Sequence, residues 1–210
     1  MILHAFWRSG ASYRTRIALN LKGLSYDVRV VNLRAGEQRS AEYTLLNPQN
    51  MLPALEVDGV VLTQSPAILE WLEETHPQPP LLPEGSQARA QVRAMAAIAG
   101  SDMQPLTNLR VLTALREDFG ADDAAVDHWA WRWNASGLAA LEVMVARYGD
   151  GWAYGATPTL ADCYLIPQIY SARRFNVALD AYPHLLAIEA AARAHPAFAA
   201  AHPDRQPDAV

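Results

Sequence analysis

The fold of this 210-residue chain is decided by the stretch FWRSGASYRTRIAL, residues 6–19. Before it, residues 1–6 are mostly apolar and predict one buried strand. After it, an apolar run predicts a helix that Gly23 ends. Two serines, a glycine and an arginine lie at the junction between strand and helix. A helix start carries unpaired N–H groups and partial positive charge, so this junction favours an anion.

The anion at this junction is expected to be a thiolate. A phosphate loop would need more glycine and a Lys-Ser/Thr pair, which residues 6–19 lack. A hydroxyl at a helix N-terminus lowers the pKa of a thiol and holds its anion. Ser9 and Ser12 are the two candidate hydroxyls. The structural alternative is that either serine is only a helix N-cap.

Composition and charge narrow the class of protein. The chain is 51% hydrophobic and 19% charged, and its net charge of −5 argues against nucleic acid as the main partner. Its apolar runs are shorter than a membrane span, and no signal peptide is visible. The single cysteine, Cys163, excludes an intramolecular disulfide, and the histidines lack metal-ligand spacing. We therefore expect a cytoplasmic protein with no metal and no membrane partner.

Residues 1–80 predict a small α/β domain with the order β-α-β-α-β-β-α. Asp58-Gly59 between two short apolar runs is the preferred turn of a β-hairpin. Ser65 as N-cap and Pro66 at the first helical position then open a helix. Residues 77–85, rich in proline, predict a stiff linker to a second domain. The remaining expected elements are strands at 26–31, 54–57 and 60–62 and a short helix at 41–46.

Residues 86–210 predict an all-helical domain. The first helix is expected to run over residues 88–115, with a kink at Pro105. The tail from Pro203 is polar and is expected to fray. The other expected helices cover residues 122–148 and 159–175 and begin near Tyr182-Pro183 and Pro196.

Two motifs of the first domain are candidate ligand sites. Pro53 directly precedes a strand, where a cis peptide bond would let Leu52 offer its N–H and C=O to a peptide-like ligand. An ordinary trans turn is the alternative. Gln64-Ser65 begins a second helix, and a ligand carboxylate could bind the Ser65 hydroxyl and the N–H groups there. Simple capping by Ser65 is compatible with that role.

Arginines of both predicted domains suggest a site for carboxylates. Arg174 ends a helix, where the dipole alone favours a cation, but arginine also binds planar carboxylates in bidentate fashion. Arg8 and Arg174 could together clamp a dicarboxylate. Arg110, in QPLTNLR at 104–110, is a third candidate or else a solvated charge. The Thr-x-x-Asp box at 159–162 is interpreted as a structural helix cap.

These motifs, in this order, resemble the zeta class of the glutathione transferase superfamily. The family hallmark is Ser-Ser-Cys-x-x-Arg-x-Arg-Ile-Ala-Leu, and residues 9–19 match it except that Gly10 and Ala11 replace the second serine and the cysteine. A cysteine-assisted step is therefore excluded. The resemblance covers nearly the whole chain. Its further features are Leu52-Pro53, residues 64–68, the box at 159–162, Asn47-Pro48, Gln104-Pro105, residues 172–175 and Tyr182-Pro183.

The resemblance implies a glutathione transferase fold, with a thioredoxin-like domain over 1–80 and a helical domain over 86–210. It also implies a homodimer that uses glutathione to convert a maleyl keto acid, maleylpyruvate or maleylacetoacetate, to its fumaryl isomer in the degradation of aromatic compounds or amino acids. A general conjugating or dehalogenating glutathione transferase is one alternative. A non-enzymatic glutathione-binding protein is the other.

The resemblance also assigns roles to residues. Ser9 takes the place of the serine that stabilises the thiolate, with Ser12 as backup, and the sulfur adds to the conjugated double bond so that it can rotate. Arg8 and Arg174 are expected to hold the substrate carboxylates and the developing charge. The residues expected to bind glutathione are Leu52, Pro53, Gln64, Ser65, Gln104, Asn108 and Arg110.

Overall fold

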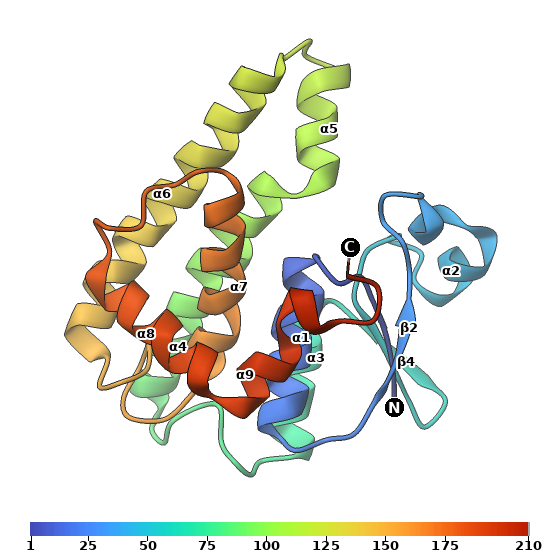
Figure 1. The fold of residues 1–210 in the computed structure, drawn as a ribbon. Coiled ribbons are helices and arrows are strands. Elements are labelled where there is room, and N and C mark those ends of the chain that lie inside the picture. Colours follow the sequence, from blue (N-terminus) through green and yellow to red (C-terminus); the bar gives the residue numbers. More distant parts are fainter. Residues whose placement is uncertain (210) are drawn as a thin grey trace. The chain divides into compact units, whose positions relative to one another are not determined.

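The computed structural model describes residues 1–209, which form two compact units (Figure 1). The first, here called the N-terminal unit, comprises Met1–Leu81 together with the residues from Arg193 onward. The second, the helical unit, comprises Leu82–Ala192. The helical unit is therefore shorter than the domain expected over 86–210, because the last residues of the chain pack with the first.

A four-stranded sheet with the order β2-β1-β3-β4 forms the frame of the N-terminal unit. β1 (Ile2–Ala5) runs parallel to β2 (Asp27–Val30) and antiparallel to β3 (Ala54–Val57). β3 continues through a tight turn into β4 (Val60–Thr63). Asp58 and Gly59 at that turn have φ of 49° and 81°, the left-handed backbone that a two-residue hairpin turn requires. The hairpin predicted from Asp-Gly is confirmed.

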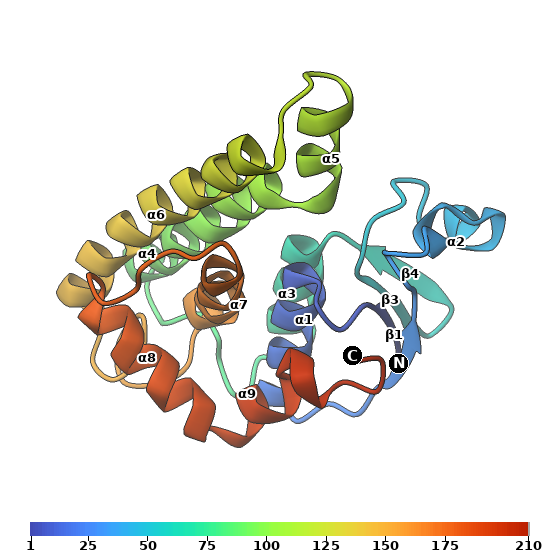
Figure 2. The same ribbon diagram turned by 45° about the horizontal axis from the view of Figure 1, so that its top comes forward.

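The helix that follows the decisive stretch is buried on all sides. In α1 (Gly10–Leu21) every residue from Ala11 to Leu19 is buried. The reason is that α1 packs against both α3 (Ser65–Thr75) and α9 (Pro196–Ala201). Figure 2 shows α1 and α3 side by side on one side of the sheet, with α2 (Ala41–Leu46) on the other.

A buried ion pair joins the ends of α1 and α3. Lys22 Nζ lies 2.7 Å from Glu73 Oε2, and its second partner is the Pro79 carbonyl oxygen, also at 2.7 Å. The same glutamate oxygen accepts the Leu81 N–H at 2.9 Å. This contact fixes the proline-rich segment that leaves the N-terminal unit.

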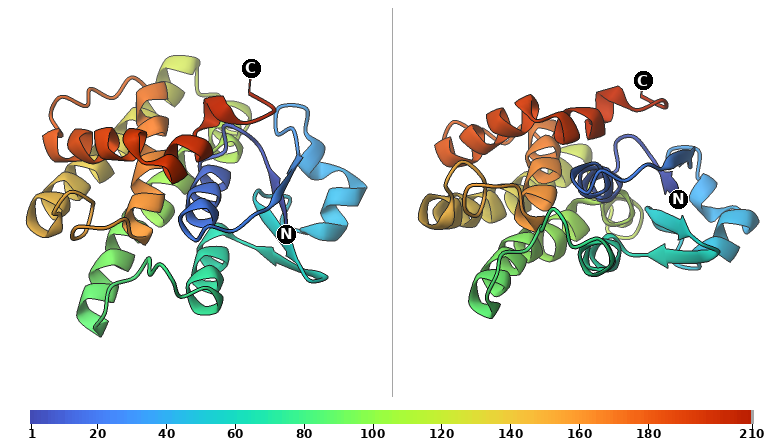
Figure 3. Two further views of the ribbon diagram at one scale, coloured as in Figure 1. Left: turned by 60° about the horizontal axis from the view of Figure 1, so that its bottom comes forward. Right: turned by 90° about the horizontal axis from the view of Figure 1, so that it is seen from below.

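The C-terminal segment belongs to the N-terminal unit and is held by hydrogen bonds. After α8 (Pro183–Ala194), α9 lies beside α1, as both views of Figure 3 show. The Asn20 side chain donates to the Ala197 carbonyl oxygen at 2.9 Å, and the Trp7 N–H donates to Asp208 at 2.9 Å. The prediction of a frayed tail from Pro203 is therefore wrong. Its polar residues find partners far away in the sequence, which local composition does not reveal.

The helical unit is built around α7 (Leu160–Arg174), which packs against α4 (Ser86–Ala97) and α6 (Asp123–Tyr148). The single helix expected over 88–115 is wrong. Pro105 lacks an N–H, and Asn108 caps a new helix with its side chain, so the chain passes through a π-helical turn and a 3₁₀ turn instead. No helix among residues 1–209 is long and apolar enough to span a membrane. The bounds are α4 Ser86–Ala97, η2 Ile98–Met103, η3 Gln104–Thr107, α5 Leu109–Glu117, α6 Asp123–Tyr148 and α7 Leu160–Arg174.

Candidate functional site

The strand register gathers three chain segments at one end of the sheet. His4 near the end of β1 pairs with Ala54 at the start of β3, and Ala54 pairs with Thr63 at the end of β4. The loops that leave β1, enter β3 and leave β4 therefore lie at the same edge. These loops and the first residue of α3 carry six of the seven predicted residues of the N-terminal unit, which are Arg8, Ser9, Leu52, Pro53, Gln64 and Ser65. The seventh, Ser12, lies in the first turn of α1.

A β-turn at the end of β1 sets the position of Ser9. The Ser9 N–H donates to the Phe6 carbonyl oxygen at 3.1 Å, which makes Trp7 and Arg8 the corner residues. Ser9 is also the N-cap of α1, because its Oγ accepts the Ser12 N–H at 3.2 Å. A hydroxyl has one donor and two lone pairs, so capping leaves the Ser9 O–H able to donate to an anion. The structural and the ligand-binding roles of Ser9 are compatible.

Ser12, the alternative hydroxyl, has a different environment. Its side chain is fully buried, and its Oγ accepts the Phe6 N–H at 3.5 Å. Ser9 is only half-buried. Exposure therefore favours Ser9 over Ser12 as a group that meets a ligand.

The start of α3 differs from the sequence-based expectation. Gln64, not Ser65, is the N-cap, and the Gln64 backbone has a φ of 65°. Ser65 is the first helical residue, so its predicted capping role is wrong. The first turns of α1 and α3 both lack an acidic residue. Neither first turn therefore supplies a carboxylate of its own to neutralise the partial positive charge of the helix start.

The loop before β3 is held in place by hydrogen bonds to the Met51 carbonyl oxygen. The Leu52–Pro53 peptide bond is cis, which decides between the cis and trans alternatives that the sequence left open. The Tyr43 hydroxyl and the Asn47 side-chain amide both donate to the Met51 carbonyl oxygen, each at 2.8 Å. Burial raises the pKa of Tyr43 to about 12, so its hydroxyl remains a donor at neutral pH. Sequence reasoning missed the role of both residues. Asn47 was noted only as part of the resemblance, and nothing local distinguishes Tyr43 from an ordinary residue of a short helix.

Side-chain contacts bring the loops of this edge together. Leu52 packs in one buried cluster with Phe6 and Trp7, beside the β1–α1 turn. The Gln64 amide donates to the side-chain oxygen of Gln49, which lies in the loop before β3. The Arg8 guanidinium lies over the Trp7 ring, 5.5 Å from its centroid. Six of the seven predicted residues of this unit thus share one edge of the sheet.

The helical unit carries the other four predicted residues. Asn108 is the N-cap of α5 and accepts the Val111 N–H at 3.3 Å, while Arg110 is exposed in the first turn of that helix. Gln104 begins the 3₁₀ turn before it. Arg174 is exposed at the end of α7, 5.6 Å from the centroid of the Phe175 ring.

A packing contact links the end of α7 to α5 and α6. Phe175 packs against the cluster of Leu112, Val126 and Ala130. The neighbouring Arg173 is bound by Glu189 through two hydrogen bonds of 3.1 and 2.6 Å. Arg8 belongs to the N-terminal unit and Arg174 to the helical unit, so their joint clamp stays a prediction.

Comparison with known protein sequences points in one direction. Residues 8–75 match the glutathione S-transferase N-terminal domain. The chain is 49% identical to maleylpyruvate isomerase from Ralstonia sp., and the match covers 100% of both proteins. It is 50% identical to maleylacetoacetate isomerase from Pseudomonas aeruginosa, with 99% of this chain and 98% of that protein covered.

Solved structures give the same result. The holo structure of a maleyl pyruvate isomerase, described as a bacterial glutathione S-transferase in the zeta class, has a TM-score of 0.98 at 48% identity and full coverage of both chains. A maleylacetoacetate isomerase from Anaeromyxobacter dehalogenans, solved with glutathione in its active site, has a TM-score of 0.90 at 47% identity. That match covers 100% of this chain and 97% of the other.

Proposed function

Because this chain belongs to the zeta class of the glutathione transferase superfamily, we propose that it converts a maleyl keto acid to its fumaryl isomer with glutathione as cofactor. The substrate is maleylpyruvate or maleylacetoacetate, formed in the breakdown of aromatic compounds or amino acids. The observation that carries the proposal is identity near 50% over the full chain to enzymes named for these two reactions.

The donors of the N-terminal unit fit glutathione, a tripeptide with one thiol and two carboxylates. Ser9 and the N–H groups of α1 would hold the sulfur, and the Leu52 backbone would bind the peptide. Ser65, with Gln64 beside it at the start of α3, would hold a carboxylate at a helix start that has no acidic residue of its own. Bound glutathione supplies a thiolate that adds to the conjugated double bond and departs after the bond has rotated.

The arginines would act on the substrate. A guanidinium is planar and binds a carboxylate through two parallel hydrogen bonds, so Arg8 and Arg174 would hold the two ends of a maleyl acid. The same charges would stabilise the negative charge that develops on the substrate's keto oxygen. Contact with the Trp7 ring restricts the side chain of Arg8. The remaining candidates for binding glutathione or substrate are Gln104, Asn108 and Arg110.

An absorbance assay of the purified protein tests the proposed function. Maleylpyruvate and maleylacetoacetate are each supplied with and without glutathione. We expect fast conversion to the fumaryl product that depends on glutathione, and the ratio of the two kcat/KM values identifies the physiological substrate. Conjugation of a generic electrophile without turnover of either maleyl acid would replace the proposal with a general transferase. Glutathione binding without any turnover would indicate a non-enzymatic protein.

Substitution of the two arginines tests the proposed clamp. We expect Arg8→Ala and Arg174→Ala each to lower kcat/KM by on the order of 100-fold, because each removes a charge that acts in the transition state. Arg173→Ala is the matched control, since Glu189 already binds that arginine. Unchanged turnover in both variants, with Arg173→Ala also unchanged, would refute the clamp.

The proposal includes a homodimer in the cytoplasm. The homodimer rests on the family alone. The cytoplasm is supported by the single cysteine, Cys163, which is buried and cannot form a disulfide within the chain. Light scattering coupled to size-exclusion chromatography tests the dimer, because a dimer has twice the 23.1 kDa mass of the chain.

A further inference from the structure

The backbone of Trp7 is held on both sides by residues far from it in the sequence. The Trp7 carbonyl oxygen accepts from Arg16 Nη2 at 2.9 Å, and the Trp7 N–H donates to Asp208 Oδ2 at 2.9 Å. Trp7 is a corner of the turn that carries Arg8 and Ser9. Neither its N–H nor its C=O takes part in the hydrogen bond that closes this turn, which joins the Ser9 N–H to Phe6.

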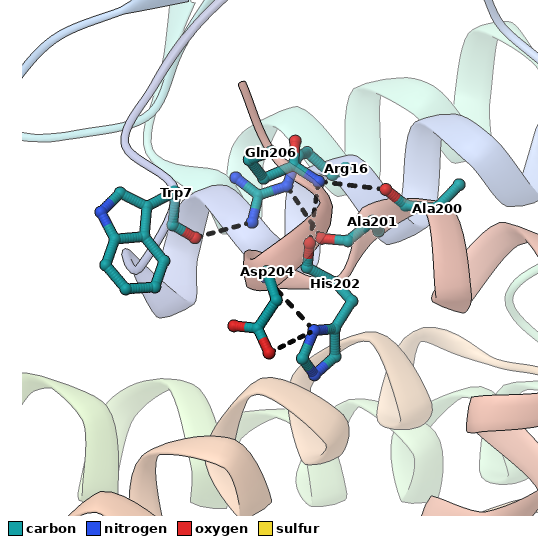
Figure 4. Close-up of polar contacts among 7 residues, drawn as sticks. All are labelled: Trp7, Arg16, Ala200, Ala201, His202, Asp204 and Gln206. Atoms are coloured by element: carbon teal, nitrogen blue, oxygen red, sulfur yellow. Dashed lines mark hydrogen bonds and ion pairs between the residues drawn. The ribbon is translucent and has the colours of Figure 1, made fainter. Parts of the chain in front are cut away.

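Arg16 connects the turn to the C-terminal segment. Its Nε donates to the Ala201 carbonyl oxygen at 3.0 Å, while its Nη2 reaches Trp7 (Figure 4). Only 1% of the Arg16 surface is exposed. The guanidinium is a rigid fork, so it holds the two carbonyl groups at a set separation. The end of α9 and the turn after β1 are thereby fixed to one another.

Hydrogen bonds within residues 200–206 fix the segment that follows α9, and Asp208 lies two residues beyond it, where it contacts the turn. Gln206 Nε2 donates to the carbonyl oxygens of Ala200 and His202 at 3.0 and 2.9 Å. His202 Nδ1 accepts the Asp204 N–H at 3.3 Å. Ala209 then packs against the buried cluster that includes Trp7.

We propose that Asp208 is a positioning residue for the β1–α1 turn, acting with Arg16 to fix the Trp7 backbone and thereby the direction of the Ser9 hydroxyl and the Arg8 side chain. This role rests on the function proposed above. A carboxylate close to a thiolate would repel it. The effect of Asp208 is therefore exerted through the backbone of the turn and not on the sulfur.

The test compares Asp208→Ala, Asp208→Asn and the control Asp204→Ala. The asparagine keeps an acceptor oxygen for the Trp7 N–H but loses the charge. The control removes the same charge from an exposed position of the same segment. Amide hydrogen exchange at Trp7 is measured in the protein without glutathione. Titration with glutathione then gives its dissociation constant, and steady-state assays give kcat and KM for the maleyl acid.

In Asp208→Ala we expect exchange at the Trp7 amide to be at least about tenfold faster, because its acceptor is lost. We expect kcat/KM to fall about 10- to 100-fold, mostly through kcat, since a small displacement of a reacting group has effects of that size. Asp208→Asn should retain most of both values, and Asp204→Ala should match the wild type.

Two results would overturn the proposal. One is wild-type exchange at Trp7 together with wild-type kcat in Asp208→Ala. The other is an Asp208→Asn variant as impaired as Asp208→Ala at unchanged melting temperature, because the acceptor would then not be what matters. The exchange measurement needs no substrate. If no maleyl acid is turned over, faster exchange still establishes the contact, and the failure lies with the proposed function.

Discussion

The starts of α1 and α7 both carry partial positive charge and N–H groups that need acceptors, but the chain treats the two helix starts differently. At α7 the chain supplies its own anion. Asp162, fully buried in the first turn, accepts the Thr159 N–H at 2.8 Å, the Thr159 hydroxyl at 2.9 Å and the Ala153 N–H at 2.8 Å. At α1 the cap is Ser9, half-buried, which accepts one N–H, and no acidic residue lies in the first turn.

This difference distinguishes a helix start used for stability from one suited to a ligand. The box at 159–162 satisfies its donors within the chain and anchors the loop before α7 through Ala153. The start of α1 keeps its positive end and a hydroxyl for an anion from outside. A helix start with no anion of its own is therefore the more informative sign of a binding site.

The strongest test of the comparison removes the Ser9 hydroxyl. We expect Ser9→Ala to lower kcat/KM by about 100- to 1,000-fold, because the hydroxyl proposed to donate a hydrogen bond to the glutathione thiolate is lost. Its effect on the free energy of unfolding should be only about 1 kcal/mol, the usual value of an N-cap. Ser40→Ala is the control, because Ser40 caps α2 through an equivalent bond of 3.2 Å to the Tyr43 N–H. Equal losses of activity in both variants would contradict the special role of α1.

The pH dependence of stability probes the anion at α7. Burial raises the pKa of Asp162 from 3.8 to about 6 against the opposing effect of its donors. The folded protein therefore binds the proton more tightly than the unfolded chain. The stability contributed by neutral Asp162 is complete below pH 3.8 and is lost as the pH rises through about 6.

Asp162→Asn removes this titration. Urea unfolding from pH 4 to 7 should show the wild type losing up to about 3 kcal/mol relative to Asp162→Asn, at about 1.4 kcal/mol per pKa unit. A difference between the two proteins that does not vary with pH would show that Asp162 titrates alike in the folded and unfolded states.

Thr159→Val tests the neutral part of the α7 cap. The valine keeps the shape of threonine but loses the hydroxyl that donates to Asp162, so we expect a loss of about 1–2 kcal/mol in the free energy of unfolding. Thr157→Val, the same change at an exposed position two residues earlier, should cost little. Activity per folded molecule should stay at the wild-type value in both variants.

The smallest effect is expected when α1 is given an anion like that of α7. A Cβ at Gly10 would meet no heavy atom within 4 Å, so the first side-chain carbon of Gly10→Asp has room. The added carboxylate should stabilise the helix by about 0.3–1 kcal/mol, because it lies near the positive end of the helix dipole. It should weaken glutathione binding by a similar amount, because it neutralises the partial positive charge that would otherwise attract the thiolate. Gly10→Asn, of the same shape but neutral, is the control. Tighter glutathione binding by Gly10→Asp would contradict the comparison, and calorimetry measures both affinities.

Local patterns were sufficient for most of the N-terminal unit. The strand, turn and helix around Ser9 follow from the pattern of residues 1–23, and Asp58-Gly59 specifies its hairpin by backbone chemistry alone. The cap at α3 was missed because serine is the better N-cap by preference. In the structure Gln64, with a φ of 65°, is the N-cap instead.

Non-local contacts explain the other errors. Most residues of 88–115 favour a helix, but Pro105 and the cap Asn108 interrupt it, and the π-helical and 3₁₀ turns η2 and η3 at this break also pack against α6. Asp208 looks like a residue of a polar tail because its partner, Trp7, lies 201 positions away. No periodicity or local motif reports a contact of that kind.

The pairing of first and last residues also orders events during synthesis. Asn20, Arg16 and Trp7 each form a hydrogen bond with a residue that is translated much later. The partners are Ala197, Ala201 and Asp208, at separations of 177, 185 and 201 residues. Residues Met1–Leu81 of the N-terminal unit emerge from the ribosome before the helical unit, yet α1 is covered by α9 only after the whole helical unit has been made. Until then one face of a buried helix is open to water and to chaperones. A helix that is translated before the helical unit is thus completed only after it.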